Sequence, residues 1–259
     1  MRVRQLKAFC TAMLLMVMLS SYTTVSNPAK NTINYQLSVS TTGTDFDTAV
    51  QKLYQTIDWS CAPMDMTVFK KALNGYLFLK QTNELKKEQF LTVLDFSKQS
   101  NQRRLWIIDL KSKQLIFNEL VAHGKNSGDK FATSFSNNSE SQKSSLGFYT
   151  TGETYNGKHR YSLKLNGLES GFNSNAFSRG IVMHGADYVS QEIAEAQQSV
   201  GRSFGCPAVS QEVIRPIVDI ISGGSCFFIY HPDADYNEKS KILNNSLYIP
   251  IELLNNLID

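Results

Sequence analysis

The 259-residue sequence lacks several patterns that define common classes of protein. It contains no Cys-x-x-Cys pair, which argues against a thioredoxin-like redox protein. Its histidines and cysteines do not follow the ligand spacing of a zinc site, and we expect neither a metal nor another cofactor. The sequence has no internal repeat, which argues against solenoid and propeller architectures.

Excess positive charge is also lacking once the N-terminus is set aside. The whole chain has a formal net charge of +3, from 26 Lys and Arg against 23 Asp and Glu. Residues 1–26 carry three basic and no acidic residues, so the rest of the chain has no net charge. Such a chain offers no electrostatic basis for binding nucleic acid, and we expect no such partner.

The first 26 residues have the features of an export signal. Arg2, Arg4 and Lys7 form a basic start, and the apolar stretch 8–20 is too short to span a bilayer comfortably. Small residues at 24–26 suit cleavage. The sequence therefore predicts a signal peptide over 1–26 and a mature protein in the periplasm or cell envelope, without a stable membrane span. An uncleaved anchor is the alternative, which the short apolar stretch disfavours.

Composition divides the mature chain into three segments. Residues 27–88 begin as a polar lead-in and continue with apolar residues at helical spacing over 45–57 and 66–78. We expect these two helices to pack on a core, the usual role of such apolar faces. Residues 89–232 form the main domain. Residues 233–259 are a C-terminal extension that is expected to pack back on the domain as a short strand and a helix.

Short apolar or alternating segments dominate the main domain and are typical of strands. A turn is expected at Asn166-Gly167, and a helix at 210–222. The polar stretch 126–145 is long, so we expect it to be mobile or to face a substrate. The predicted fold class is mainly β with short helices (α+β), preceded by a small helical segment. The expected strands lie at 90–94, 104–108, 115–121, 161–165, 180–184 and 225–230.

The candidate chemistry lies in Gly201–Ala208, a glycine-rich segment around Cys206, and in His184 upstream. A thiolate is a nucleophile, and a neutral imidazole accepts its proton near neutral pH. Gly205 leaves room for a substrate carbonyl, and the N–H groups of Gly205 and Cys206 suit a developing oxyanion. The pattern indicates an acyl-transferring thiol enzyme with Cys206 as nucleophile and His184 as base. On these residues alone, a structural cysteine in a glycine-rich turn is an equally good interpretation.

The same residues carry a resemblance to a known family. Ser203-x-Gly205-Cys206, following His184-Gly185, resembles the active-site signature of the L,D-transpeptidase (YkuD-like) family, cysteine enzymes that cross-link bacterial peptidoglycan. The similarity runs from residue 90 to residue 230, far longer than a chance motif. It includes the segments 122–124, 144–149 and 162–181.

This resemblance implies an L,D-transpeptidase-like β-sandwich catalytic domain over 89–232 that acts on peptidoglycan stem peptides. Cys206 would attack the carbonyl of a donor stem, form a thioester, and pass the acyl group to the amine of a neighbouring stem. In the family a backbone carbonyl orients the imidazole, which fits Gly185 after His184; Asp187 is the less favoured alternative. A carbapenem is expected to acylate Cys206.

Two departures from the common family pattern affect substrate binding. Phe204 stands where a histidine is usual, and Ala208 stands where an arginine is usual, so Arg202 could take over the role of that arginine. His123 is the main rival of His184 for the base, because it too precedes a glycine. The residues expected to contact the substrate are His123, Ser203, Arg202 and Tyr188.

Water in place of the amine acceptor would make the protein an L,D-carboxypeptidase or endopeptidase. A wall-binding module that has lost catalysis is a further alternative, which the presence of both Cys206 and His184 disfavours. Cys61 and Cys226 are expected to be buried or paired with each other, and Cys226 lies in an apolar strand. Two buried free thiols are slightly favoured over a disulfide. The sequence does not indicate an oligomeric state.

Overall fold

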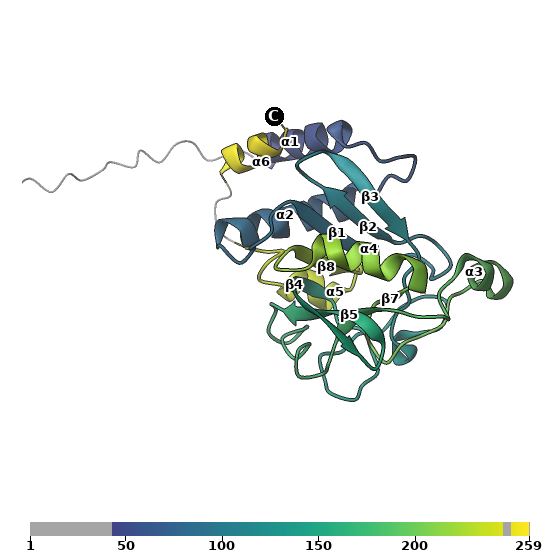
Figure 1. Ribbon diagram of the computed structural model, residues 1–259. Helices are drawn as coiled ribbons and strands as arrows, with labels where there is room; N and C mark the ends of the chain where they lie inside the picture. The colour runs from purple at the N-terminus through teal and green to yellow at the C-terminus, as the bar shows by residue number, and fades with distance from the viewer. Residues whose placement is uncertain (1–42, 246–249, 259) are drawn as a thin grey trace, which may run out of the picture. The chain divides into compact units, whose positions relative to one another are not determined.

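A computed structural model describes residues 43–245 and 250–258 (Figure 1). The predicted signal peptide and most of the polar lead-in lie outside the described residues, as does most of the predicted C-terminal strand. Within the described part, no helix is both long enough and apolar enough to cross a membrane. The described residues form one compact unit, and the helices before residue 89 share a core with the sheet.

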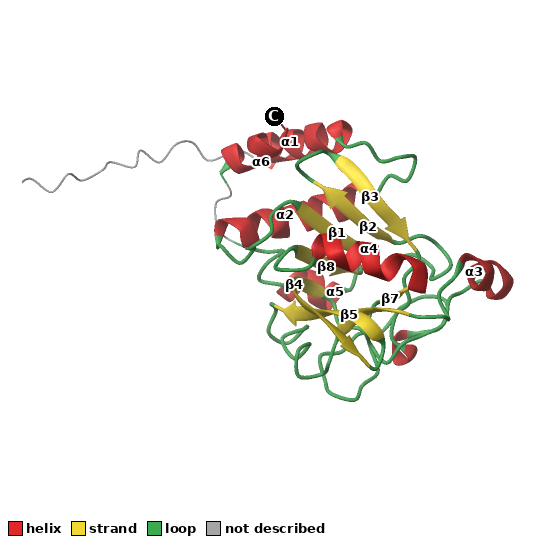
Figure 2. Cartoon of the chain, viewed as in Figure 1, coloured by secondary structure: helices red, strands yellow, loops and turns green. Residues whose placement is uncertain are grey.

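The described strands join edge to edge into one mixed sheet in the order β3-β2-β1-β8-β4-β5-β6-β7 (Figure 2). The expected mainly β fold with short helices, preceded by a helical segment, is confirmed. The strands are β1 (Phe90–Asp95), β2 (Leu105–Asp109), β3 (Gln114–Glu119), β4 (Gly147–Gly157), β5 (Arg160–Gly167), β6 (Val182–Gly185), β7 (Ala208–Val209) and β8 (Cys226–Tyr230).

Helices surround this sheet, and two of them come from opposite ends of the described chain and lie side by side: α1 and α6 (Figure 1). α2 packs against β1 and β8, and α4 packs against β5 and β6. The helices are α1 (Gly43–Thr56), α2 (Met66–Gln81), the 3-10 helix η1 (Lys125–Ser127), α3 (Gln191–Gln197), α4 (Gln211–Ile221), α5 (Ala234–Lys239) and α6 (Ile251–Ile258).

The strand β8 occupies the middle of the sheet. It runs parallel to β1, with Leu91 opposite Cys226, and antiparallel to β4, with Phe148 opposite Phe228. Every residue of β1 and β8 is buried. A strand buried on both faces has apolar residues at successive positions, which explains the sequence Cys-Phe-Phe-Ile-Tyr of β8.

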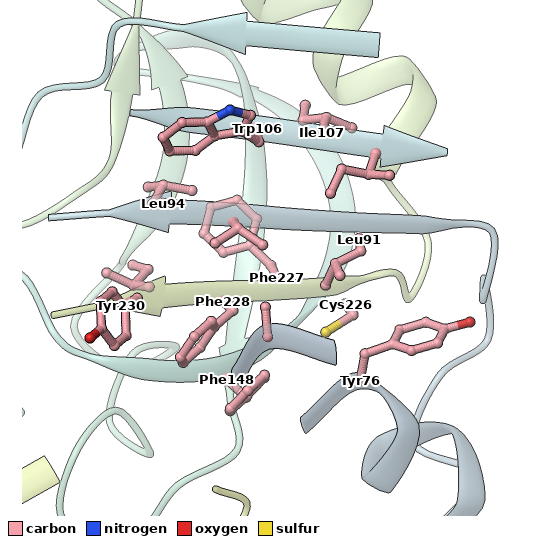
Figure 3. Packing of buried hydrophobic residues seen from close by; sticks show 14 of the residues in the cluster. Tyr76, Leu91, Leu94, Trp106, Ile107, Phe148, Cys226, Phe227, Phe228 and Tyr230 are labelled. Atoms are coloured by element: carbon pink, nitrogen blue, oxygen red, sulfur yellow. The ribbon is translucent and has the colours of Figure 1, made fainter. Parts of the chain in front are cut away.

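Helix α2 is fixed to this sheet by tight packing. Its N-cap is Asp65, whose carboxylate accepts hydrogen bonds from the N–H groups of Thr67 and Val68. A Cβ on Gly75 would lie only 2.0 Å from the Phe148 ring, so glycine allows the helix to approach the sheet this closely. The Phe148 ring stacks on Phe228 with centroids 4.0 Å apart, and Figure 3 shows both rings beneath β8. The expected packing role of the N-terminal helices is therefore confirmed.

Two expectations about turns and thiols are wrong. Asn166-Gly167 belongs to β5, and the chain reverses instead between β4 and β5, where Arg160 has a φ of +63°. Cys61 is exposed and unpaired, whereas Cys226 is buried and unpaired as favoured. The turn was mispredicted because Asn166 pairs with Thr150 across the ladder, and tertiary pairing overrides the local preference of an Asn-Gly dipeptide.

The C-terminal extension is attached to the sheet through a buried carboxylate. Glu169 accepts hydrogen bonds from the Phe148 N–H at 2.7 Å, from the Tyr236 hydroxyl at 2.9 Å and from the Ser240 hydroxyl. Burial is the largest cause that raises the pKa of Glu169 above its usual value. The predicted helix near the C-terminus is present as α6.

Candidate active site

The segment around Cys206 is a tight turn that leads into β7. Ser203 closes it: its Oγ accepts a hydrogen bond from the Gly205 N–H at 3.0 Å and donates one to the Cys206 carbonyl at 2.6 Å. Gly205 has a φ of +124°, which side chains with a Cβ rarely adopt, so glycine is required at this point of the turn. The buried Ser203 hydroxyl thus donates its hydrogen inside the turn, which gives it a structural task.

The Cys206 sulfur lies against the start of β6 and is half-buried. The Val182 N–H points at Sγ from 3.5 Å, and Sγ lies 3.7 Å from the carbonyl oxygen of Gly180. Burial raises the pKa of the Cys206 thiol, and the Val182 N–H and the charge of Arg179 oppose that rise. A thiol with a raised pKa is mostly protonated at neutral pH, so nucleophilic attack requires a base.

The β6–β7 pairing brings His184 beside this turn, because His184 lies opposite Ala208 and its N–H bonds to the Pro207 carbonyl at 3.3 Å. The imidazole Nδ1 lies 2.9 Å from the carbonyl oxygen of Gly185. Since a carbonyl only accepts, Nδ1 carries a hydrogen, and Nε2 of the neutral ring keeps its lone pair. Burial lowers the pKa of His184, and so does the nearby His159, which favours the neutral ring at neutral pH. The orienting group is therefore a backbone carbonyl and not Asp187.

His159 was not among the candidate residues of the sequence analysis, yet its ring stacks on His184 with centroids 4.3 Å apart. It stands at the tip of the β4–β5 hairpin and is exposed. Together the two histidines line a pocket of about 300 Å³. The other lining residues are Lys158, Arg160, Gly185, Ala186, Asp187, Tyr188 and Gln211.

His123 lies beside the nucleophile turn, because its carbonyl accepts the Ser203 N–H at 3.0 Å, but its side chain is fully buried. Its Nδ1 is 2.8 Å from a guanidinium nitrogen of Arg104, which can only donate, so Nδ1 accepts. Its Nε2 then carries the hydrogen and faces the Gly128 carbonyl at 3.4 Å. Burial, followed by the charge of Arg104, lowers the pKa of His123 to about 4. With both nitrogens engaged and no exposed surface, His123 offers nothing to a substrate and is no rival for the base.

Tyr188 and Arg202 both lie near the start of the turn, because the N–H of Gly201 donates to the Tyr188 carbonyl at 2.9 Å and Arg202 follows Gly201. Arg202 is exposed, pairs with Asp129 at 3.4 Å, and donates to the Gly128 carbonyl at 3.2 Å. Tyr188 is half-buried; burial, and then the neighbouring Cys206, raises its pKa to about 12. Of the four residues expected to contact the substrate, these two keep accessible side chains. Within the described residues, no group of three or more His, Cys, Asp or Glu side chains could hold a metal ion.

Sequence reasoning missed two residues that support the turn. Ser144 Oγ accepts from the Gly124 N–H at 3.0 Å and donates to the Gly205 carbonyl at 3.1 Å, joining three segments. Arg179 donates to four acceptors in the stretch 134–145. That stretch is therefore fastened to the turn by side chains. The segments of family resemblance included both residues, and this was the one signal in the sequence that could have drawn attention to them.

Comparison with known proteins agrees with this architecture. A model of the L,D-transpeptidase catalytic domain family matches residues 61–230, which is more than half of the chain. The chain therefore belongs to the L,D-transpeptidase catalytic domain family. The curated proteins include no significant match.

Solved structures are similar to this chain at a distance. An L,D-transpeptidase from Mycobacterium smegmatis is 12% identical with a TM-score of 0.36, over 55% of this chain and 59% of its own. An L,D-transpeptidase from Stackebrandtia nassauensis is 12% identical with a TM-score of 0.35, over 73% of this chain and 91% of its own. The match to the Mycobacterium smegmatis protein thus spans less than two thirds of that protein's length.

Proposed function

We propose that this protein is an exported cysteine L,D-transpeptidase that links peptidoglycan stem peptides through a thioester acyl-enzyme. The observation that carries this proposal is the pairing of β6 with β7, which brings a neutral, oriented His184 beside the turn that presents Cys206. The family supports the substrate class, and the basic, apolar start of the sequence supports export to the periplasm or cell envelope.

The first half of the reaction is acylation. Nε2 of His184 takes the proton of Cys206, and the thiolate attacks the donor carbonyl carbon to form a C–S bond. As the tetrahedral intermediate collapses, the C–N bond to the terminal D-amino acid breaks, and His184 returns the proton to the leaving amine. The second half reverses these roles: the amine of an acceptor stem attacks the thioester, loses its proton to His184, and releases the thiol of Cys206.

The oxyanion contact is assigned to the Cys206 N–H. The Gly205 N–H already donates to Ser203, so Gly205 acts through its backbone conformation, which sets the direction of the next N–H. Tyr188 and Arg202 are the proposed substrate contacts. Tyr188 and His184 both line the pocket of about 300 Å³.

The test is incubation of the purified mature protein with defined muropeptides, followed by mass spectrometry of the products. A linked dimer that has lost one terminal D-amino acid supports transpeptidation. Release of the amino acid without a dimer would replace this proposal with an L,D-carboxypeptidase. Absence of both products, with no carbapenem adduct on the intact protein, would leave only a wall-binding role.

Variants assign the two catalytic residues in the same assay. Cys206→Ala should abolish the dimer and the carbapenem adduct, whereas Cys61→Ser, which removes an exposed thiol, should leave both. His184→Ala should slow acylation by about 10²- to 10⁴-fold, the usual contribution of general acid–base catalysis. His123→Ala should lower the melting temperature more than the acylation rate of the folded fraction; the reverse ranking would return His123 to the role of base.

A further inference from the structure

Arg179 is held in one position by hydrogen bonds to neutral groups. One guanidinium nitrogen, Nη1, donates to the Ser136 carbonyl at 2.7 Å and to the Ser145 hydroxyl. The other, Nη2, donates to the Lys143 carbonyl at 2.7 Å and to the Ser141 hydroxyl at 3.1 Å. All four acceptors lie in the stretch 134–145, so the planar fork of the guanidinium is fixed in orientation as well as in place.

None of these acceptors carries a charge. The described residues show no carboxylate within ion-pair distance of Arg179. Burial lowers the pKa of Arg179, while Tyr149 and Cys206 oppose that effect. Tyr149 donates its hydroxyl hydrogen to the Ser145 carbonyl and its pKa is strongly raised, so it stays neutral. A partly buried cation without a counter-ion is unfavourable, which indicates that an anion belongs beside it.

The backbone places Arg179 next to the sulfur of Cys206. Its own successor, Gly180, provides the carbonyl oxygen that lies 3.7 Å from Sγ. On the other side, a Cβ built on Gly205 would lie 3.4 Å from Nη2 of Arg179. The thiol therefore lies next to the residue that follows Arg179, and the Arg179 guanidinium approaches the nucleophile turn at Gly205.

We propose that Arg179 is a positioning residue that supplies the cation of the thiol site: its fixed guanidinium stabilises the Cys206 thiolate. This assignment rests on the proposed function, in which Cys206 is the nucleophile. Arg179 takes no proton and forms no covalent bond. Tyr188 also lies near the thiol and stays protonated, because burial and Cys206 raise its pKa to about 12. Arg202, which the sequence analysis considered for substrate binding, is paired with Asp129.

The test is the pH dependence of alkylation by iodoacetamide, with adducts at Cys206 quantified by peptide mass mapping so that Cys61 does not interfere. An opposite charge nearby lowers a pKa by about 1–3 units, so Arg179→Gln should raise the thiol pKa by about one unit or more. At a pH below the thiol pKa, Arg179→Gln should be alkylated about tenfold or more slowly than the unsubstituted protein. Arg215→Gln is the matched control, because this guanidinium packs on the Tyr161 ring away from the thiol, and it should leave the thiol pKa unchanged.

Arg179→Lys separates charge from hydrogen bonding. An ammonium keeps the charge but cannot reproduce the planar fork, so we expect a smaller rise in the thiol pKa together with a lower melting temperature. If Arg179→Gln does not fold, the neutral variant Arg179→Met takes its place. An unchanged thiol pKa in a folded neutral variant would overturn the assignment and leave Arg179 as a structural brace. Alkylation needs no peptide substrate. If the muropeptide assay fails while Arg179→Gln still raises the thiol pKa, the proposed reaction is rejected and this inference stands.

Discussion

Two regions of this fold are held together by different interactions. In the first, which we name the apolar half, α2, β1, β8 and the start of β4 bury aromatic and aliphatic side chains (Figure 3). In the second, the polar half, residues 124–145, 168–181 and 203–206 are joined mainly by hydrogen bonds between side chains and backbone. The nucleophile turn with Cys206 lies in the polar half, and His184 lies beside it on β6.

The difference shows how a stable scaffold and an accurately arranged site are obtained from one chain. Apolar burial is non-directional and roughly proportional to area, so it stabilises the sheet without fixing individual atoms. A hydrogen bond depends on distance and angle, so each bond in the polar half fixes a particular group. We therefore expect substitutions in the apolar half to affect stability most, and substitutions in the polar half to affect reactivity at a smaller cost in stability.

The largest expected effect is the loss of an aromatic ring from the apolar half. Phe228→Ala removes a fully buried ring that stacks on Phe148, and we expect a loss of about 3–5 kcal/mol in the free energy of unfolding. Phe177→Ala is the control in the polar half, since this ring is 68% exposed. Its expected cost is within about 0.5 kcal/mol, as for other surface substitutions. Urea unfolding measures both, and equal losses would remove the distinction between the two halves.

A smaller effect is expected for the buried carboxylate of Glu169, and it depends on pH. Since the folded pKa of Glu169 is raised, the native state holds its proton to higher pH than the unfolded state does. The free energy of unfolding should therefore fall as pH rises above the ordinary glutamate value and level off above the folded pKa. Glu169→Gln should remove this decline, which is about 1.4 kcal/mol for each unit of pKa shift. The control Glu84→Gln, at an exposed carboxylate, should keep this decline. If Glu169→Gln shows a decline as large as that of the unsubstituted protein, another group causes it.

The smallest effect is expected at the tip of the β4–β5 hairpin. When His159 is cationic it lowers the pKa of His184, so His159→Ala should raise the pKa of His184. A base is active only when unprotonated, so the acidic limb of the acylation–pH profile should move to higher pH, by less than about one unit. Asn156→Ala, an exposed change on the same hairpin, should leave the profile in place. A shift toward lower pH would contradict the electrostatic role given to His159.

The apolar half was largely predictable from sequence. The run at 225–230 and the alternating segments at 90–94 and 104–108 became β8, β1 and β2, because continuous burial leaves a continuous apolar pattern. The helical spacing at 66–78 likewise became α2. The pairing of β1 with β8 was not predictable, since a local pattern does not specify which distant strand is the neighbour.

In the polar half and beside it, the sequence motifs identified individual residues but not their contacts. The positions of Cys206 and His184 followed from their chemistry and from family resemblance, and pairing of β6 with β7 brings their segments together. The role of Arg179 did not follow, because its partners are four groups up to forty-three residues away in sequence. His123 was assigned to the substrate through the family resemblance, and a histidine before a glycine looks the same whether it faces a cleft or a buried arginine. Burial alone distinguishes the two cases, and a sequence does not record it.

The central place of β8 has a consequence for the order in which the molecule is made. A ribosome completes β1 and β4 long before residues 226–230, yet these two strands have no direct pairing and meet only through β8. Until then each leaves one edge of hydrogen-bonding groups open, and open edges promote association with other chains. Contacts between such distant segments also slow folding. A transcript cut short before residue 226 would therefore yield two incomplete half-sheets rather than a smaller enzyme.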